Sequence, residues 1–98
     1  MSERIISPDA IRDLREIVDY YAIHNVEAGE RILKEFNKQC VYLVQFPMMG
    51  RSYESVRPGL RAVPMADYLL FYRILEPGLE VVRVMHRKRD WRSVLEED

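Results

Sequence analysis

The residues best suited to chemistry gather near the C-terminal end, in the stretch RVMHRKRDW at 83–91. His86 could act as a general base, and the basic residues 87–89 could stabilise a phosphate or bind carboxylates. RNA cleavage without a metal also needs an acid, and the segment RSVLEED at 92–98 contains neither tyrosine nor histidine. The stretch therefore fits an incomplete active site, a nucleic-acid patch or a surface that another protein binds.

Other kinds of site find no support in the sequence. Cys40 and the two histidines, His24 and His86, are too far apart for a zinc site, and neither HExxH nor a calcium-loop pattern occurs. The segment GRSYESVRPG at 50–59 lacks the GK[ST] ending and the GxGxxG spacing of phosphate-binding loops, and GxSxG is absent. We therefore expect neither a cofactor nor a metal, and no catalytic residue is assigned. His24 is expected to be a solvated turn residue.

Most arginines lie in the second half of the chain, where they are mixed with Tyr53, Tyr68, Tyr72 and Trp91. Such residues are enriched in binding surfaces because a guanidinium can donate two hydrogen bonds to one carboxylate, and aromatic rings bury a large area at low entropic cost. For Arg73 and Arg83, which fall in the middle of expected strands, exposure on the wet face of a sheet is an equal alternative. For the contiguous cluster at 87–89, a partner surface is the better interpretation.

Composition and charge limit the class of protein. The 98 residues, 48% apolar and 32% charged, suit one globular domain over 1–98. One cysteine, no signal peptide and no apolar run long enough for a membrane predict a cytoplasmic protein away from membranes. Residues 1–50 carry six basic and eight acidic residues (−2), 51–92 carry nine and five (+4), and 93–98 carry −3. This balance favours a protein partner over direct binding to DNA.

Two amphipathic helices are expected in the first half. Ser7, followed by Pro8 and Asp9, is a helix start, and apolar residues recur at helical spacing to Tyr21. Acidic and basic residues, including Asp13, cover much of the other face. Asn25 caps a second helix that runs to about Val44. Gly29, near its start, should lower the stability of that helix slightly. Together the two helices form a helical hairpin whose apolar face must be covered.

Short strands are expected on either side of this hairpin. RIIS at 4–7 precedes it, and LRAVPM, YLLFYRIL and EVVRVMH follow a loop at 45–59. Pro64 favours a sheet edge or a bulge. The fold class is α+β, in the order β-α-α-β-β-β, with the helical hairpin packed on a small antiparallel sheet. Residues 91–98 are expected to form a short helical turn and a flexible tail.

The ordered landmarks resemble the RelE/ParE superfamily of toxins from type II toxin–antitoxin modules, and its ParE branch in particular. SPDAIRDLREIVDYYAIHN resembles the opening helix, and FPMMGR resembles the P-x-x-G-R loop. RPGLRAV, YLLFYRI and VVRVMHRKRD resemble the G-L-R strand, the Y-x-x-x-Y-R strand and the R-V-x-H-x-x-R-D ending. The resemblance covers nearly the whole chain, and its specificity lies in the ordered combination.

The resemblance implies a toxin that inhibits DNA gyrase and that a cognate ParD-like antitoxin neutralises in a hetero-oligomer. Such an antitoxin would have an acidic wrapping segment and a DNA-binding N-terminal domain. A RelE-like mRNA endonuclease is the alternative, but that branch tends to place an arginine where this chain has Leu69. A non-toxic module member that only binds its antitoxin is the third possibility.

Two sets of residues are candidates for these contacts. We expect the antitoxin carboxylates to meet Arg51, Arg57, Arg61 and Arg83. We expect the target to meet His86, Arg87, Arg89 and Trp91.

Overall fold

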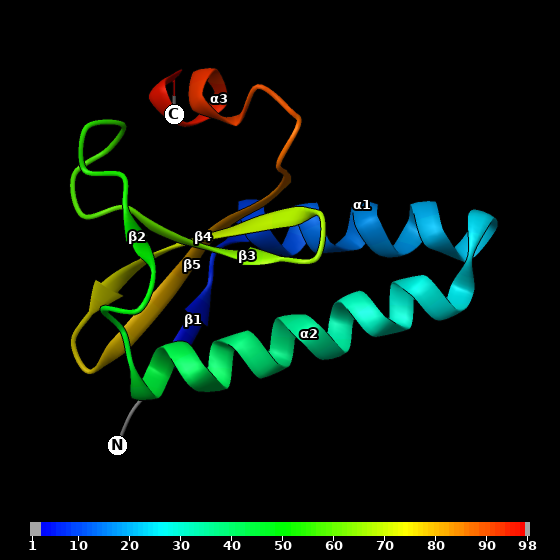
Figure 1. Ribbon diagram of the computed structural model, residues 1–98, viewed down its shortest axis with the longest axis horizontal. Coiled ribbons are helices and arrows are strands. Elements are labelled where there is room, and N and C mark those ends of the chain that lie inside the picture. The colour runs from blue at the N-terminus through cyan, green and yellow to red at the C-terminus, as the bar shows by residue number, and fades with distance from the viewer. Residues whose placement is uncertain (1–2, 98) are drawn as a thin grey trace.

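The computed structural model describes residues 3–97 and confirms an α+β architecture (Figure 1). The elements follow in the order β1 (Arg4–Ile6), α1 (Pro8–His24), α2 (Val26–Gln45), β2 (Arg51–Ser52), β3 (Arg61–Met65), β4 (Tyr68–Leu75), β5 (Gly78–His86) and α3 (Trp91–Glu97). Residues 91–97 are helical where a short helical turn and a flexible tail were expected, and Asp98 lies outside the described residues.

Side-chain caps define where the two long helices begin. The Ser7 hydroxyl accepts a hydrogen bond from the Ala10 amide at 3.0 Å, and the Asn25 side chain accepts one from the Ala28 amide at 3.1 Å. Each cap satisfies an amide of the first turn that has no partner within its helix. Asn25 is both the C-cap of α1 and the N-cap of α2, so this single residue connects the two helices.

Gly29 lets the two helices of the hairpin approach closely. A Cβ at this position would lie 2.9 Å from the Cβ of Tyr21, closer than such atoms normally come. Gly29 lowers the intrinsic stability of α2 slightly, but its missing side chain lets α1 and α2 pack closely.

The sheet is mixed, whereas a purely antiparallel sheet was expected. Its strands lie in the order β1-β5-β4-β3-β2, and β1 runs parallel to β5. A parallel pair needs a long connection, and the helical hairpin with the β2–β4 segment supplies one between β1 and β5. The two-residue strand β2, inside the expected loop, pairs with β3 only at Arg61 and Ala62. Pro64 therefore lies on a stretch of β3 without an outer partner among residues 3–97, which confirms an edge position.

Apolar side chains cover both faces of the sheet. On one face, Tyr72, Val81 and Val84 pack under α1 and α2. On the other, Phe71, Val82 and Met85 pack under α3, which Figure 1 shows apart from the helical hairpin. Since adjacent strand residues point to opposite faces, the strands are apolar on both sides, as expected of a sheet buried between two layers. No helix within 3–97 combines the length and apolar character needed to cross a membrane.

Candidate protein-binding surface

His86 ends β5 at the site that the sequence singled out. Its Nδ1 accepts a hydrogen bond from the Lys88 amide at 3.1 Å, and its ring lies edge-on to Tyr68 with 5.3 Å between centroids. Because a backbone amide can only donate, Nδ1 is the acceptor in this arrangement. One ring nitrogen of His86 is therefore used to hold its own turn.

Tyr68, beside His86, cannot act as a base at neutral pH. Burial, together with a hydrogen bond to Tyr21, raises the pKa of Tyr68 to about 12. A phenol with this pKa stays protonated and cannot serve as a base in the physiological range. Within 3–97, moreover, no group of three or more His, Cys, Asp or Glu side chains could hold a metal ion.

The basic cluster after β5 projects into solvent. Residues 87–89 are all exposed, and the Arg87 side chain, 59% exposed, lies 3.8 Å from the equally open Asp67. An ion pair in water contributes at most about 1 kcal/mol, so Arg87 can exchange this partner for another. Arg89 lines a shallow hollow of 180 Å³ with Tyr20 and His86. The structure thus brings three of the four target-facing candidates to one surface.

Trp91, the fourth candidate, holds α3 against the sheet. Its ring packs against Tyr53 at 5.3 Å and against Phe71 at 5.1 Å, and the side chain is half-buried. Leu95, one turn later, is 1% exposed. Trp91 therefore offers a partner only part of its ring.

Arg83 is not accessible for binding an antitoxin carboxylate. It is 8% exposed and forms an ion pair with Asp13, which is 5% exposed and had been expected on the solvent face of its helix. A buried charge needs a partner, and these two residues supply each other with one. We therefore assign Arg83 a structural role. Arg73, the other mid-strand arginine, is exposed and pairs with Glu80 at 2.6 Å.

The remaining antitoxin candidates differ in the exposure of their side chains and in the hydrogen bonds that their guanidinium groups donate. Arg57 donates to the carbonyl of Leu95 at 2.8 Å, and Arg61 donates to the carbonyl of Gly50 at 2.6 Å. Arg51 is exposed, with its guanidinium 5.4 Å from the centre of the Tyr53 ring. Of the four arginines, only Arg51 is exposed, whereas Arg57 and Arg61 are half-buried and Arg83 is buried.

Tyr72 joins the landmark motifs that are separate in the sequence. Its hydroxyl donates to the carbonyl of Pro47 at 2.7 Å and accepts from the Gly50 amide at 2.9 Å. The carbonyl of Gly50 in turn accepts from Arg61. The loop motif, the G-L-R strand and the tyrosine strand therefore meet in one largely buried hydrogen-bond network, where burial also raises the pKa of Tyr72. Sequence spacing alone could not reveal this shared role.

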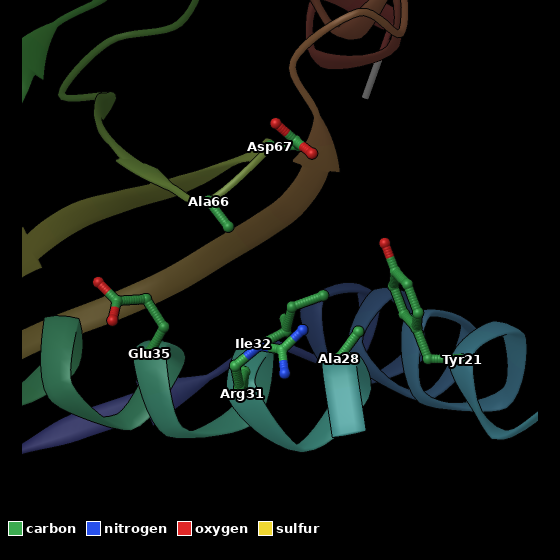
Figure 2. A pocket seen from close by; sticks show the side chains of 7 residues that line it. All are labelled: Tyr21, Ala28, Arg31, Ile32, Glu35, Ala66 and Asp67. Atoms are coloured by element: carbon green, nitrogen blue, oxygen red, sulfur yellow. The ribbon is translucent and has the colours of Figure 1, made fainter. Parts of the chain in front are cut away.

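A larger hollow of 430 Å³ lies between the helical hairpin and the β3–β4 turn (Figure 2). Figure 2 shows Glu35, Ile32 and Ala28 of α2 on the side of the helix that faces Ala66. Small and apolar residues are joined by charged residues of both signs, the lining being Tyr21, Ala28, Arg31, Ile32, Glu35, Ala66 and Asp67. No signal in the sequence had indicated this hollow. Its mixed character suits contact with a protein.

Comparison with known proteins identifies the family. Residues 4–91 match the family described as the ParE toxin of type II toxin–antitoxin systems, parDE. This chain belongs to the ParE toxin family. It is 36% identical to Toxin ParE1 from two strains of Mycobacterium tuberculosis over 93 residues, which cover 92% of this chain and 95% of each relative.

A solved structure supports the fold of this ParE-family toxin. The chromosomal ParDE toxin–antitoxin system from P. aeruginosa contains a chain that superposes with a TM-score of 0.72 at 20% identity. The match covers 88% of this chain and 96% of that chain. Membership of the family makes the protein a toxin of a type II toxin–antitoxin system and implies an antitoxin partner.

Proposed function

We propose that this ParE-family toxin inhibits DNA gyrase by binding it, without catalysing a reaction of its own. The observation that carries the choice is the engaged Nδ1 of His86, which accepts from the Lys88 amide. One ring nitrogen of His86 is used in this turn, and residues 92–98 supply no tyrosine or histidine, so the basic surface is better suited to binding a partner than to moving protons. Its target-facing residues are His86, Arg87 and Arg89, with the accessible part of Trp91.

The RelE-like mRNA endonuclease stays the second candidate. The exposed cations at 87–89 could contact phosphates, which is the observation in its favour. Against it, the sheet surface under α3 is filled with apolar side chains such as Phe71 and Met85, and residues 92–98 contain neither tyrosine nor histidine. The non-toxic alternative requires the same antitoxin contact but no target.

We further propose that a ParD-like antitoxin neutralises the toxin through a flexible, acidic segment that orders on binding. Such coupled folding lets a small partner cover a large surface. Arg51 is the best placed of the predicted carboxylate contacts because its side chain is exposed. Arg57 and Arg61 stay predicted contacts, although both are half-buried and already donate to the carbonyls of Leu95 and Gly50. The burial of Arg83 removes it from this set.

The decisive experiment is plasmid supercoiling by purified gyrase with the toxin added. We expect inhibition with trapped, cleaved DNA, and relief when the cognate antitoxin is present. Replacing Arg87, Lys88 and Arg89 by alanine should abolish inhibition. A matched variant that replaces the exposed residues Arg15, Lys34 and Lys38 by alanine should retain it.

Each alternative predicts a different result. Unaffected supercoiling at excess toxin would contradict the gyrase proposal, and codon-positioned cuts on translating ribosomes would then establish the endonuclease. Normal growth after induction, with antitoxin binding intact, would instead support the non-toxic member.

A further inference from the structure

The outer edge of β1 is open to an additional strand, because β1 ends the sheet and no strand within 3–97 lies beyond it. The carbonyl of Glu3 and the amide of Ser7 bond the main chain of β5, each at 3.0 Å. Successive residues of a strand direct their backbone groups to opposite edges. The amides and carbonyls of Arg4 and Ile6 therefore point outward, away from β5.

A hollow lies beside this edge on the helical side of the sheet. It measures 370 Å³ and is lined by Arg4, Asn37, Cys40, Val41, Val44 and Gln45. The Arg4 side chain reaches across to the Asn37 side chain at 3.1 Å, which places the hollow between β1 and α2. Val44 also lines a second hollow of 190 Å³ at the β4–β5 turn, so the two are neighbours. A strand added to β1 would direct alternate side chains toward this side.

The surface around the hollow is unusually free of charge. Residues 39–50, QCVYLVQFPMMG, contain no Asp, Glu, Lys or Arg in a chain that is 32% charged. Several of its large apolar side chains face water, with Val41 55%, Phe46 60% and Met48 65% exposed. Exposed apolar patches of this kind mark binding sites, and methionine adapts to a partner's shape. Cations border the run, with Lys38 before it and Arg4 across the hollow.

We propose that the antitoxin adds an extended segment to the outer edge of β1, with apolar side chains at alternate positions and acidic residues beside them. Main-chain hydrogen bonds to Arg4 and Ile6 would supply affinity, and the hollow would select the side chain that enters it. The proposal rests on neutralisation by an antitoxin, and it adds an apolar site at the sheet edge opposite Arg51. A second copy of the toxin fits less well, because two-fold pairing through β1 would bring two Arg4 side chains together.

The binding test uses two matched pairs of variants and purified cognate antitoxin, with dissociation constants measured by calorimetry. Val41→Asp places a charge in the hollow, whereas Ile23→Asp places one on the remote hairpin tip, where Ile23 is 84% exposed. We expect Val41→Asp to weaken binding by about tenfold or more and Ile23→Asp to leave it unchanged. Both positions are exposed, so both variants should fold, which circular dichroism checks.

The second pair isolates the main-chain contact. Arg4→Pro and Arg4→Ala both remove the guanidinium, but only proline removes the outward amide, and an edge strand tolerates proline. We expect Arg4→Pro to bind about fivefold more weakly than Arg4→Ala. In the wild-type complex, hydrogen exchange should slow at the amides of Arg4 and Ile6.

The outcomes separate the site from the partnership. Equal affinities of Val41→Asp and Ile23→Asp for the antitoxin, or equal affinities of the two Arg4 variants, would overturn the β1 site while leaving antitoxin binding intact. A wild-type toxin that binds no antitoxin would overturn the proposed neutralisation and the site together.

Discussion

Asp13 and Arg83 lie 70 positions apart in the chain and form a buried, bidentate ion pair. Oδ2 of Asp13 accepts from Nε of Arg83 at 2.8 Å, and Oδ1 accepts from Nη2 at 3.0 Å. Oδ2 also accepts from the Val84 amide at 2.9 Å, so the carboxylate holds both the side chain and the backbone of β5. The pair therefore connects α1 with the strand that leads to His86.

Removing this carboxylate should destabilise the fold strongly. Asp13→Ala leaves a buried arginine without its counter-charge, and we expect the free energy of unfolding in urea at pH 7 to fall by about 3–5 kcal/mol. Asp19→Ala, on the exposed side of the same helix, should change it by less than about 0.5 kcal/mol. Adding Arg83→Met to Asp13→Ala should recover part of the loss. Equal stability of the two single variants would contradict a structural role for the pair.

Gly50 should resist replacement because Tyr72 occupies the space of a side chain. A Cβ at Gly50 would lie 2.5 Å from the Tyr72 hydroxyl oxygen and 2.6 Å from a ring carbon. We expect Gly50→Ala to lower the free energy of unfolding by about 1–3 kcal/mol, as overpacking does elsewhere. Met49→Ala, at the neighbouring exposed position, is the control and should be nearly neutral. A stable Gly50→Ala protein would show that the loop moves away without cost.

Replacing Ala66 by glycine should stabilise the protein. Its φ of 54° at the β3–β4 turn lies in the left-handed region, which costs L-residues other than glycine about 1 kcal/mol or more. Glycine removes this strain but is more flexible when unfolded, so we expect Ala66→Gly to raise stability by at most about 1 kcal/mol. Ala22→Gly, at an exposed helical position, should instead lower stability by about 1 kcal/mol. Thermal unfolding of both variants shows whether the two substitutions change stability in opposite directions.

His86 should contribute to inhibition through contact and not through catalysis. His86→Asn keeps a polar side chain at this position but cannot exchange protons near neutral pH. If the site binds a partner, the toxin concentration needed for half-inhibition of gyrase should rise less than about tenfold. Loss of a catalytic base would reduce activity by about 10²–10⁴-fold, so a loss of that size would support an enzymatic mechanism.

Stability should fall at alkaline pH partly through Tyr68. Its pKa is raised to about 12 in the folded protein, above its ordinary value of 10.0, so the folded state retains a proton that the unfolded state loses. The resulting stabilisation is complete below pH 10 and disappears as pH rises toward 12. Urea midpoints at pH 9 and 11.5 should therefore differ less in Tyr68→Phe than in the wild type. Tyr42→Phe, at an exposed position on α2, controls for the loss of a hydroxyl; an unchanged difference in Tyr68→Phe would contradict the prediction.

Local patterns in the sequence were enough to locate the long elements. The start signals at Ser7 and Asn25 act over three residues, and both helices begin where these signals stand. The strand at 68–75 has the predicted bounds, since alternation and β-branched or aromatic residues act within one segment. The ordered motifs were likewise enough to indicate the ParE family, which the comparisons confirm.

The candidate site was predictable only in part. Contiguity in the sequence brought His86, Arg87 and Arg89 to one surface, because neighbours in a turn remain neighbours in space. Exposure did not follow in the same way, as the half-buried Trp91 shows. The two sets of contacts themselves stay predictions until binding is measured.

Tertiary structure alone decided which charged and apolar residues are available to a partner. Arg83 and Arg73 occupy similar positions in their strands, yet one pairs with Asp13 in the interior and the other with Glu80 at the surface. The open edge of β1 likewise depends on its parallel pairing with β5, more than 70 residues later in the register Arg4 to Leu79. Sequence determines what a side chain can do, because its chemistry and local spacing are written there. Which groups meet depends on long-range packing, and that packing left a largely apolar hollow beside the open edge of β1.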